Sequence, residues 1–229
     1  RLSVIPYSKI SADHFADPDK IYIPFIASGG CEEIFQSYAF FIPLPLIFLY
    51  DHQHNSLPAA LELTTYFSQG KINVPMIFSE DELTSESMEL FYRMQQTVRN
   101  LKKTHVAVVG GPSPWLLSSN VDFAALTRIL GIHFQNITID AVVESFKQHT
   151  KLSRENVTLF QKILKQATQL TNCTREDVYD SVRMYQALDD LMVYHSCNAL
   201  TVKCFDLIQK CNVTACMALS LFNQAGIPA

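Results

Sequence analysis

The sequence predicts an α/β protein made of two Rossmann-like, three-layer α/β/α domains with mainly parallel sheets. Short apolar runs rich in β-branched and aromatic residues alternate with longer segments of helical periodicity along the 229 residues. Strand followed by helix, repeated throughout, is typical of parallel sheets joined by right-handed crossovers. The apolar fraction of 48% and the charged fraction of 17% are those of a folded globular chain with a buried core.

The first predicted domain spans residues 1–103. Its predicted strands and helices alternate, with strands at 21–26, 44–49 and 74–78 and helices at 32–40, 57–67 and 79–103. Ser56 is placed to cap the second helix, and Pro58 follows at a position that tolerates proline. The last helix opens on acidic residues and closes on Lys102 and Lys103, as the helix dipole favours. We expect the boundary between the two domains directly after this helix.

The second predicted domain spans residues 104–229. Its predicted strands lie at 106–109, 134–139 and 199–205, and its predicted helices at 122–130, 157–170, 176–194 and 212–225. Gly131 is placed to stop the first of these helices, and Thr174 with Asp177 has the pattern of a capping box. Residues 227–229 have the pattern of a further strand, so we expect this domain to be cut short at its C-terminus.

Composition argues against two classes of partner. The formal net charge is −4 and Lys102-Lys103 is the only adjacent basic pair of note, so we expect no binding to nucleic acid. The apolar run at 38–50 is broken by Pro43 and Pro45 and is too short for a bilayer, so we expect no membrane span. The N-terminus lacks both the layout of a signal peptide and an initiator Met, and the six cysteines contain no Cys-x-x-Cys pair. We therefore expect reduced thiols, a cytoplasmic location and a chain cut from a longer one.

The first candidate binding loop follows the first predicted strand. Ligands of open α/β sheets bind at the carboxyl ends of strands, so the loops there matter most. Gly29 and Gly30 would let the backbone approach a ligand closely, and Cys31 and Glu32 would present side chains beside it. The alternative is a tight turn from strand to helix with no ligand.

The second candidate loop follows the next predicted strand and is rich in polar side chains. His52, His54 and Asn55 could hydrogen-bond sugar hydroxyls, carry protons or bind a metal. A complete metal site is not expected here, because the two histidines have no obvious third ligand nearby. The alternative is a solvated loop.

Two further candidate loops follow strands of the second domain. The glycine- and proline-rich loop 110–115 ends on Trp115, which could stack on a sugar face or fill a gap in the core. The other loop carries Lys203, Cys204 and Asp206. There Cys204 could be a thiolate beside the lysine or simply a buried thiol, and Asp206 could merely cap the next helix.

Six strings stand in a fixed order along the chain. They are Gly-Gly-Cys-Glu at 29–32, Asn-Ser-Leu-Pro-Ala-Ala-Leu-Glu at 55–62, Val-Val-Gly-Gly-Pro-Ser-Pro-Trp-Leu at 108–116, Ala-Leu-Thr-Val-Lys-Cys-Phe-Asp at 199–206, Cys-Met-Ala-Leu-Ser-Leu at 216–221 and Gly-Ile-Pro-Ala at 226–229. In this order and spacing the chain resembles the family of L-fucose isomerase and related sugar isomerases. The resemblance covers most of the chain from about Ile21 onward.

The resemblance implies an enzyme that interconverts aldoses and ketoses through an enediol, with a divalent metal, usually Mn²⁺, holding the sugar oxygens. It also implies two Rossmann-like domains, a further C-terminal domain and assembly as a homo-oligomer. The family's metal-binding Glu, Asp and His would follow Ala229, so no catalytic residue and no metal ligand is carried over onto this chain. We expect the chain alone to be inactive and to hold no metal tightly. Cys31 stands where relatives often have Thr, and Lys203 where they have Arg, which keeps the charge but loses the two-pronged geometry.

Three functions stay open on this evidence. The first is the N-terminal portion of a metal-dependent isomerase that binds a fucose- or arabinose-like monosaccharide. The second is a sugar-binding or regulatory module without enzymatic activity. The third is a cofactor-independent racemase that uses Cys31 and Cys204 as acid and base, although bulky Phe205 crowds the second of these thiols.

Overall fold

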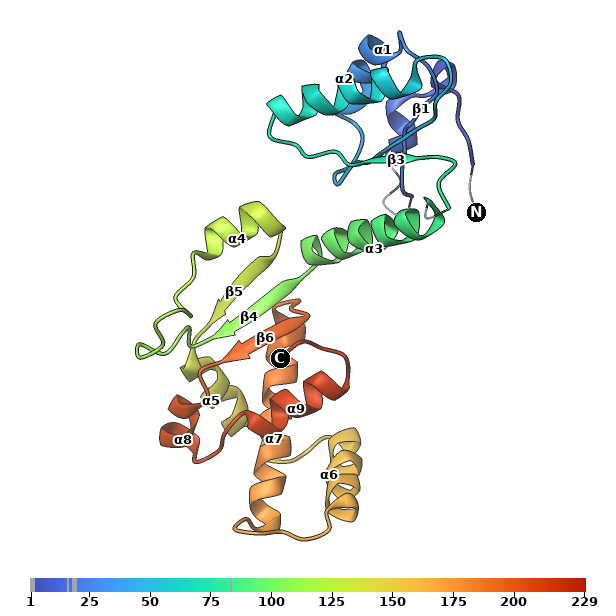
Figure 1. The fold of residues 1–229 in the computed structure, drawn as a ribbon. Helices are drawn as coiled ribbons and strands as arrows, with labels where there is room; N and C mark the ends of the chain where they lie inside the picture. The colour runs from blue at the N-terminus through green and yellow to red at the C-terminus, as the bar shows by residue number, and fades with distance from the viewer. Residues whose placement is uncertain (1–2, 16, 18–19, 83) are drawn as a thin grey trace. The chain divides into compact units, whose positions relative to one another are not determined.

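The chain is a mixed α/β protein that divides into two compact units, Arg1–Arg99 and Asn100–Ala229. The computed structural model describes residues 3–15, 17, 20–82 and 84–229. Each unit contains a three-stranded sheet in which every pair of neighbouring strands is parallel (Figure 1). The prediction of an α/β chain with parallel sheets is therefore confirmed. Among the described residues, no helix has the length and apolarity needed to cross a bilayer.

The first unit is built around the sheet β1-β2-β3. Its elements are two short 3₁₀ turns, Tyr7–Lys9 and Ala12–Phe15, then β1 (Phe25–Ile26), α1 (Glu32–Ala39), β2 (Phe48–Tyr50), α2 (Ser56–Gln69), β3 (Met76–Phe78) and α3 (Thr84–Lys102), whose last residues belong to the second unit. Phe48 of β2 is fully buried and packs with Ala59, Ala60 and Leu63 of α2. The core of this unit thus lies between the sheet and α2.

Prolines explain why the strands of the first unit are shorter than predicted. A proline has no amide hydrogen for the ladder, so it stands at the edge of a strand or before it. The run predicted as strand 21–26 forms only β1, although the Pro24 carbonyl oxygen already accepts from the Leu49 amide at 2.9 Å. The run predicted as strand 44–49 contains Pro45, and only its last residues form β2, which starts at Phe48.

The prediction that Ser56 caps α2 is wrong. Ser56 is the first residue of the helix, and the cap position belongs to Asn55, which has a left-handed backbone with φ of 61° and makes no side-chain cap bond. The Ser56 hydroxyl is buried and bonds to the ends of two strands instead. A tertiary demand on this side chain therefore overrides its local preference for capping.

The second unit is built around the sheet β5-β4-β6. Its elements are β4 (His105–Val109), α4 (Phe123–Leu130), β5 (His133–Ile137), α5 (Ile139–Gln148), α6 (Arg154–Gln166), α7 (Arg175–Tyr194), β6 (Ala199–Val202), α8 (Phe205–Cys211) and α9 (Cys216–Gln224). After α9 the chain returns to β6, where the Leu200 amide donates to the Pro228 carbonyl oxygen at 3.0 Å. The last residues thus lie along the edge of β6 that faces away from β4.

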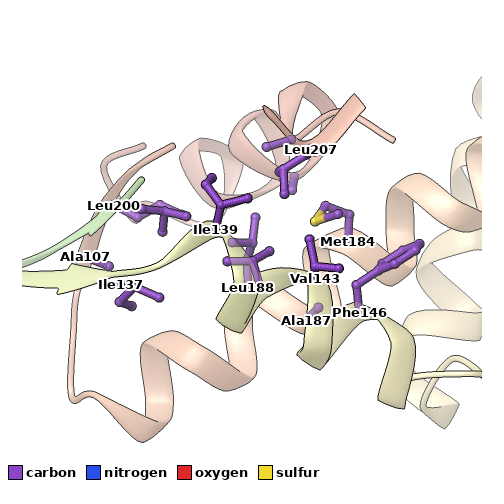
Figure 2. Packing of buried hydrophobic residues seen from close by; sticks show 14 of the residues in the cluster. Ala107, Ile137, Ile139, Val143, Phe146, Met184, Ala187, Leu188, Leu200 and Leu207 are labelled. Carbon is purple, nitrogen blue, oxygen red and sulfur yellow. The ribbon is translucent and has the colours of Figure 1, made fainter. Parts of the chain in front are cut away.

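One face of the second sheet carries the main core. Ala107, Ile137 and Leu200 point from the three strands toward the helices α5 and α7 (Figure 2). They meet buried side chains that include Val143 of α5 and Leu188 of α7. α7 also packs against α6 and α9, so this long helix joins most of the unit together.

Several predicted boundaries in the second unit hold and others do not. Gly131 ends α4 with φ of +76°, and the capping box of Thr174 and Asp177 is present at the start of α7, as predicted. The prediction missed α5, because it ran the preceding strand on to Ile139, which is the first residue of that helix. It also ran β6 on to residue 205, missed α8 and began the next helix at residue 212. In the structure α8 ends before Asn212, whose φ of 55° breaks the helix, and α9 starts at Cys216.

Candidate functional site

The loops after β1 and β2 contact each other at the carboxyl end of the first sheet. The Gly29 amide donates to the His54 carbonyl oxygen at 2.9 Å. A Cβ atom on Gly29 would lie 3.1 Å from Cβ of Asn55, so a side chain there would crowd the second loop. Gly30 follows with φ of +80°, a left-handed conformation in which glycine is favoured. The structure therefore brings together two of the predicted binding loops.

A buried hydroxyl holds these two strand ends together. The Ser56 hydroxyl donates to the Ile26 carbonyl oxygen at the end of β1 and accepts from the Asp51 amide at 2.8 Å just after β2. The Asp51 carboxylate in turn accepts from the Gln53 amide at 2.8 Å. Ser56 thus positions the histidine-containing loop, a role that the sequence pattern did not indicate.

The histidines of this loop are exposed. The ring of His52 lies 4.4 Å from that of Phe78, centroid to centroid, and is tilted by 40°. His54 and Asn55 have left-handed backbones, with φ of 50° and 61°. Within the described part of the chain, no group of three or more His, Cys, Asp or Glu side chains could hold a metal ion. The loop therefore offers hydrogen-bonding groups to a ligand at the surface.

Cys31 and Glu32 lie where the glycine loop after β1 enters α1. Cys31 occupies the N-cap position and Glu32 is the first helical residue, and both are half-buried. Burial raises the pKa of the Cys31 thiol above its ordinary value of 9.0, and the charge of Glu32 raises it further. Cys31 is therefore kept in its neutral form at neutral pH.

The corresponding end of the second sheet is more tightly packed. Gly110 follows β4 with φ of +78°, and its amide donates to the Ile137 carbonyl oxygen at 2.9 Å. A Cβ atom there would lie 2.7 Å from Ile139 and 3.1 Å from Cβ of Lys203. Gly110 is thus enclosed by the chain that follows β5 and the chain that follows β6. The next residue, Gly111, also has positive φ at +69°, but a Cβ atom there would meet no other atom within 4 Å.

An exposed aromatic pair lies beyond these glycines. Trp115 is 60% exposed and Phe205 is 61% exposed, and their ring centroids are 6.3 Å apart with the rings at 60° to each other. Trp115 comes from the loop after β4, and Phe205 is the first residue of α8, after β6. Trp115 is therefore a surface aromatic at the carboxyl end of the sheet rather than a core residue.

A charged pair and a thiol lie between β6 and α8. The ammonium group of Lys203 is 3.0 Å from the carboxylate of Asp206, and the Lys203 side chain is only 19% exposed. Cys204 lies between them in sequence, and its side chain is half-buried. Burial raises the pKa of the Cys204 thiol above 9.0, and the neighbouring Cys216 raises it further. Lys203 and Asp206 thus offer one donor group and one acceptor group beside the aromatic pair.

The predicted site residues fall into two groups, one in each unit. The first unit holds seven of them: Gly29, Gly30, Cys31, Glu32, His52, His54 and Asn55. The second unit holds Trp115, Lys203 and Cys204. The two cysteines of the racemase hypothesis, Cys31 and Cys204, thus belong to different units.

Strand ends do not indicate one further polar cluster, because it lies between helices. The ring of His149, after α5, has Nδ1 2.7 Å from the Ser145 carbonyl oxygen and Nε2 2.6 Å from the Asp190 carboxylate. Both ring nitrogens therefore face oxygen atoms of neighbouring residues. Arg183 of α7 adds a bond from Nε to the His149 carbonyl oxygen at 2.7 Å. The cluster joins α5 to α7.

A signal for α5 was nevertheless present in the sequence. Ile139, Val142, Val143 and Phe146 follow the i, i+3, i+4, i+7 spacing of an amphipathic helix, and all four are buried. Thr138 precedes them, and its hydroxyl accepts from the Ala141 amide at 3.1 Å as the N-cap. With α5 recognised, the position of His149 at its end could have been inferred.

Comparison with known proteins gave no match to this chain, either among protein-family models or among curated protein sequences.

Proposed function

We propose that this chain is the N-terminal portion of a metal-dependent aldose–ketose isomerase and that its strand-end loops form part of a site for a fucose- or arabinose-like monosaccharide. In this proposal each unit is a Rossmann-like domain, and the protein acts in the cytoplasm as a homo-oligomer. The observation that best supports a sugar-binding role is the exposed Trp115 at the carboxyl end of the second sheet, whose ring packs with Phe205, a residue that the Lys203–Asp206 pair flanks in sequence.

The chemistry of this surface suits a monosaccharide. A sugar ring has an apolar face of C–H groups that packs on an aromatic ring, and Trp115 exposes such a ring. Its hydroxyl groups both donate and accept hydrogen bonds, and Lys203 and Asp206 provide a charged donor and a charged acceptor.

The position of this surface supports the same proposal. Gly110, Lys203 and the chain after β5 converge at the carboxyl ends of three neighbouring parallel strands. That edge is where open α/β sheets bind their ligands. In the first unit the contact between Gly29 and His54 marks the equivalent edge, with the polar loop beside it.

The described residues do not fit a manganese site. Mn²⁺ prefers several oxygen ligands held together, and the described part of the chain has no suitable group of three acidic, histidine or cysteine side chains. We therefore derive no catalytic step through a metal. The role proposed for this chain's own residues is to bind and orient the sugar by stacking and hydrogen bonding.

The proposal can be tested by fluorescence, because Trp115 is the sole tryptophan. Titration with L-fucose or L-arabinose should give a saturable change in Trp115 emission, whereas a non-carbohydrate polyether at the same concentration should not. The absence of any sugar-dependent change up to about 10 mM, well above an ordinary substrate requirement, would overturn the proposal.

Matched lysine variants sharpen this test. Lys203→Ala should weaken sugar binding about tenfold, because a hydrogen bond to a charged group is lost. Lys210→Ala is the control, since Lys210 lies on α8 and pairs with Asp140 instead. Equal weakening in both variants would show that general charge, and not the Lys203–Asp206 pair, attracts the sugar.

Turnover separates the isomerase from the non-enzymatic module. Both bind sugar at the same surface, but only an isomerase, assayed as the longest natural protein with Mn²⁺ added, converts an aldose into the matching ketose. The racemase hypothesis gains no support from the thiols. A base at neutral pH needs a lowered pKa, and burial raises the pKa of both Cys31 and Cys204.

A further inference from the structure

Two histidines open neighbouring strands of the second sheet. His105 is the first residue of β4, and His133 is the first residue of β5. The parallel ladder pairs these two residues with each other, so their side chains leave the same face of the sheet. Their ring centroids are 4.8 Å apart, and the ring planes are tilted by 34°. The sheet thus places two imidazoles side by side at its amino end.

The backbone of this pair is held in place, while the rings are available. The His133 amide donates to the Thr104 carbonyl oxygen at 2.9 Å, and the His105 amide donates to Oδ1 of Asn198 at 2.8 Å. The His105 carbonyl oxygen accepts from the Asn198 amide at 2.9 Å. Both histidines are exposed, and neither ring has a hydrogen bond or an ion pair with another described residue. Both imidazoles are therefore positioned by the sheet and open to a ligand.

The spacing of the rings fits two ligands of one metal ion. A metal–imidazole nitrogen bond is about 2.0–2.1 Å long and the ring centre lies about 1.1 Å further on, so two imidazoles bound at about 90–110° have centres about 4.5–5.2 Å apart. The observed 4.8 Å lies within this range. The terminal torsion of histidine is broad, so rotation of the rings directs one nitrogen from each toward a common ion at little cost.

We propose that His105 and His133 form a two-histidine site for a divalent transition-metal ion that prefers imidazole nitrogen, Zn²⁺ or Ni²⁺. The described residues contain no group of three or more His, Cys, Asp or Glu side chains that could hold a metal, so water fills the remaining positions of the ion. This site is independent of the proposed sugar-binding function, because the candidate sugar loops follow the carboxyl ends of the strands. It also differs from a Mn²⁺ site, since Mn²⁺ prefers oxygen ligands.

A bound ion would link the edge of the sheet to its centre. β5 is an edge strand whose only neighbour in the sheet is β4, the central strand. An ion held by one histidine from each strand joins them at their amino ends, beside the last bonds of the ladder. Because the ion binds the folded sheet, it should stabilise the pairing of β5 with β4 in proportion to its occupancy.

The test is a calorimetric titration of the full chain, first stripped of metal and freed of chelator, with Ni²⁺ as the probe. One ion per chain should bind with a dissociation constant below about 0.1 mM. Mg²⁺ at the same concentration should give no binding heat, because it prefers oxygen ligands. A dissociation constant for Ni²⁺ above this limit would overturn the proposal.

Variants show whether the two imidazoles hold one ion together. His105→Ala and His133→Ala should each weaken Ni²⁺ binding about tenfold or more, and the double variant should bind about as weakly as either one, because a single imidazole is a poor site. His14→Ala, which removes a histidine of the first unit whose ring bonds to Ser11, is the matched control and should bind as the wild type does. Unchanged binding in both single variants, or half the stoichiometry with unchanged affinity, would overturn the proposal.

A second measurement confirms that the variants are folded and locates the ion. Both side chains are exposed and the hydrogen bonds of these residues use the backbone, so hydrogen exchange without metal should be the same in variants and wild type. Ni²⁺ should slow exchange in β4 and β5 of the wild type and of His14→Ala, but not of His105→Ala or His133→Ala. Slowing in all four proteins would place the ion elsewhere and contradict the two-histidine site.

Discussion

The two units secure the ends of their strands in different ways. In the first unit a buried hydroxyl does this: Ser56 hydrogen-bonds to Ile26 and Asp51, and the glycine loop rests on the neighbouring loop with moderate crowding. In the second unit close packing does it, because Gly110 lies against Ile139 and Lys203 with no room for a Cβ atom. Two Gly-Gly loops that look alike in sequence therefore depend on different physical interactions.

The helices of the two units also differ, in how their N-termini are capped. In the second unit α4, α5, α6 and α7 each begin with a side-chain cap, from Asp122, Thr138, Ser153 and Thr174, whereas α8 and α9 begin without one. In the described part of the first unit, α1 and α2 start without a side-chain cap bond. The second unit is thus specified more by local signals, and the first more by contacts between distant segments. Substitutions in each unit test this difference.

Gly110→Ala should have the largest effect on stability. A left-handed alanine costs about 1–2 kcal/mol and overpacking a further 1–3 kcal/mol, so we expect a loss of about 3 kcal/mol in the second unit. Hydrogen exchange of peptides from β4 and α5 measures it. Gly111→Ala is the control, since it shares the positive φ but has open space around it. Equal losses in both variants would show that the backbone conformation alone, and not the packing of Gly110, matters.

Ser56→Ala should have the next largest effect, and in the first unit. It leaves the Ile26 carbonyl and the Asp51 amide without their buried partner, which costs about 2 kcal/mol. Faster hydrogen exchange in β1 and β2 measures the loss. Ser68→Ala, at an exposed position of the same helix, should change it by less than about 0.5 kcal/mol. If the two serine variants lose the same amount of stability, the hydrogen bonds of the Ser56 hydroxyl do not stabilise the strand ends.

Thr174→Ala should have a moderate effect, about 1 kcal/mol, because it removes the cap of α7. It should also change the pH dependence. Hydrogen bonds from the Thr174 amide and hydroxyl lower the pKa of Asp177 below its ordinary 3.8. The stabilisation from Asp177 is therefore present above pH 3.8 and is lost as the pH falls through the lowered pKa.

The free energy of unfolding of the second unit, measured in denaturant at neutral pH and at pH values below 3.8, checks this pH dependence. The wild type should lose more stability on acidification than Thr174→Ala does, because the variant no longer favours the charged form of Asp177. Ser181→Ala, a position of α7 whose hydroxyl bonds only within the helix to the Asp177 carbonyl oxygen, is the control. An unchanged acid sensitivity in Thr174→Ala would argue against the capping box as its source.

The fold could be predicted where the signals are local. The capping box of Thr174 and Asp177 and the glycine stop at Gly131 depend on neighbouring residues, and the structure confirms both. Ser56 could not be assigned in this way, because its hydroxyl bonds to Ile26, thirty residues earlier in the chain. Strand lengths were overestimated for a related reason. Apolar residues beside Pro24 and Pro45 have strand-like composition, but proline cannot complete the ladder.

The candidate site was predictable only in part. Strand-end loops can be located from the alternation of strands and helices, and this found the loops of Gly29, His54 and Lys203. Which loops touch depends on the order of strands in the sheet, which the sequence does not encode locally. The enclosure of Gly110 by Ile139 and Lys203 follows from β4 lying between β5 and β6.

Trp115→Ala should have the smallest effect on stability, less than about 0.5 kcal/mol, because Trp115 is 60% exposed and its main aromatic contact is the equally exposed Phe205. A buried residue of the same unit, such as Phe222, should instead cost about 3–5 kcal/mol when replaced by alanine. Calorimetric titration with L-fucose then separates the two possible roles of Trp115. A large loss of sugar affinity with unchanged stability would mean that the tightly packed end of the second sheet exposes this aromatic ring for a ligand. A large loss of stability would mean that Trp115 belongs to the packing that encloses Gly110. The close packing that distinguishes the second unit from the first would then include its exposed loop after β4.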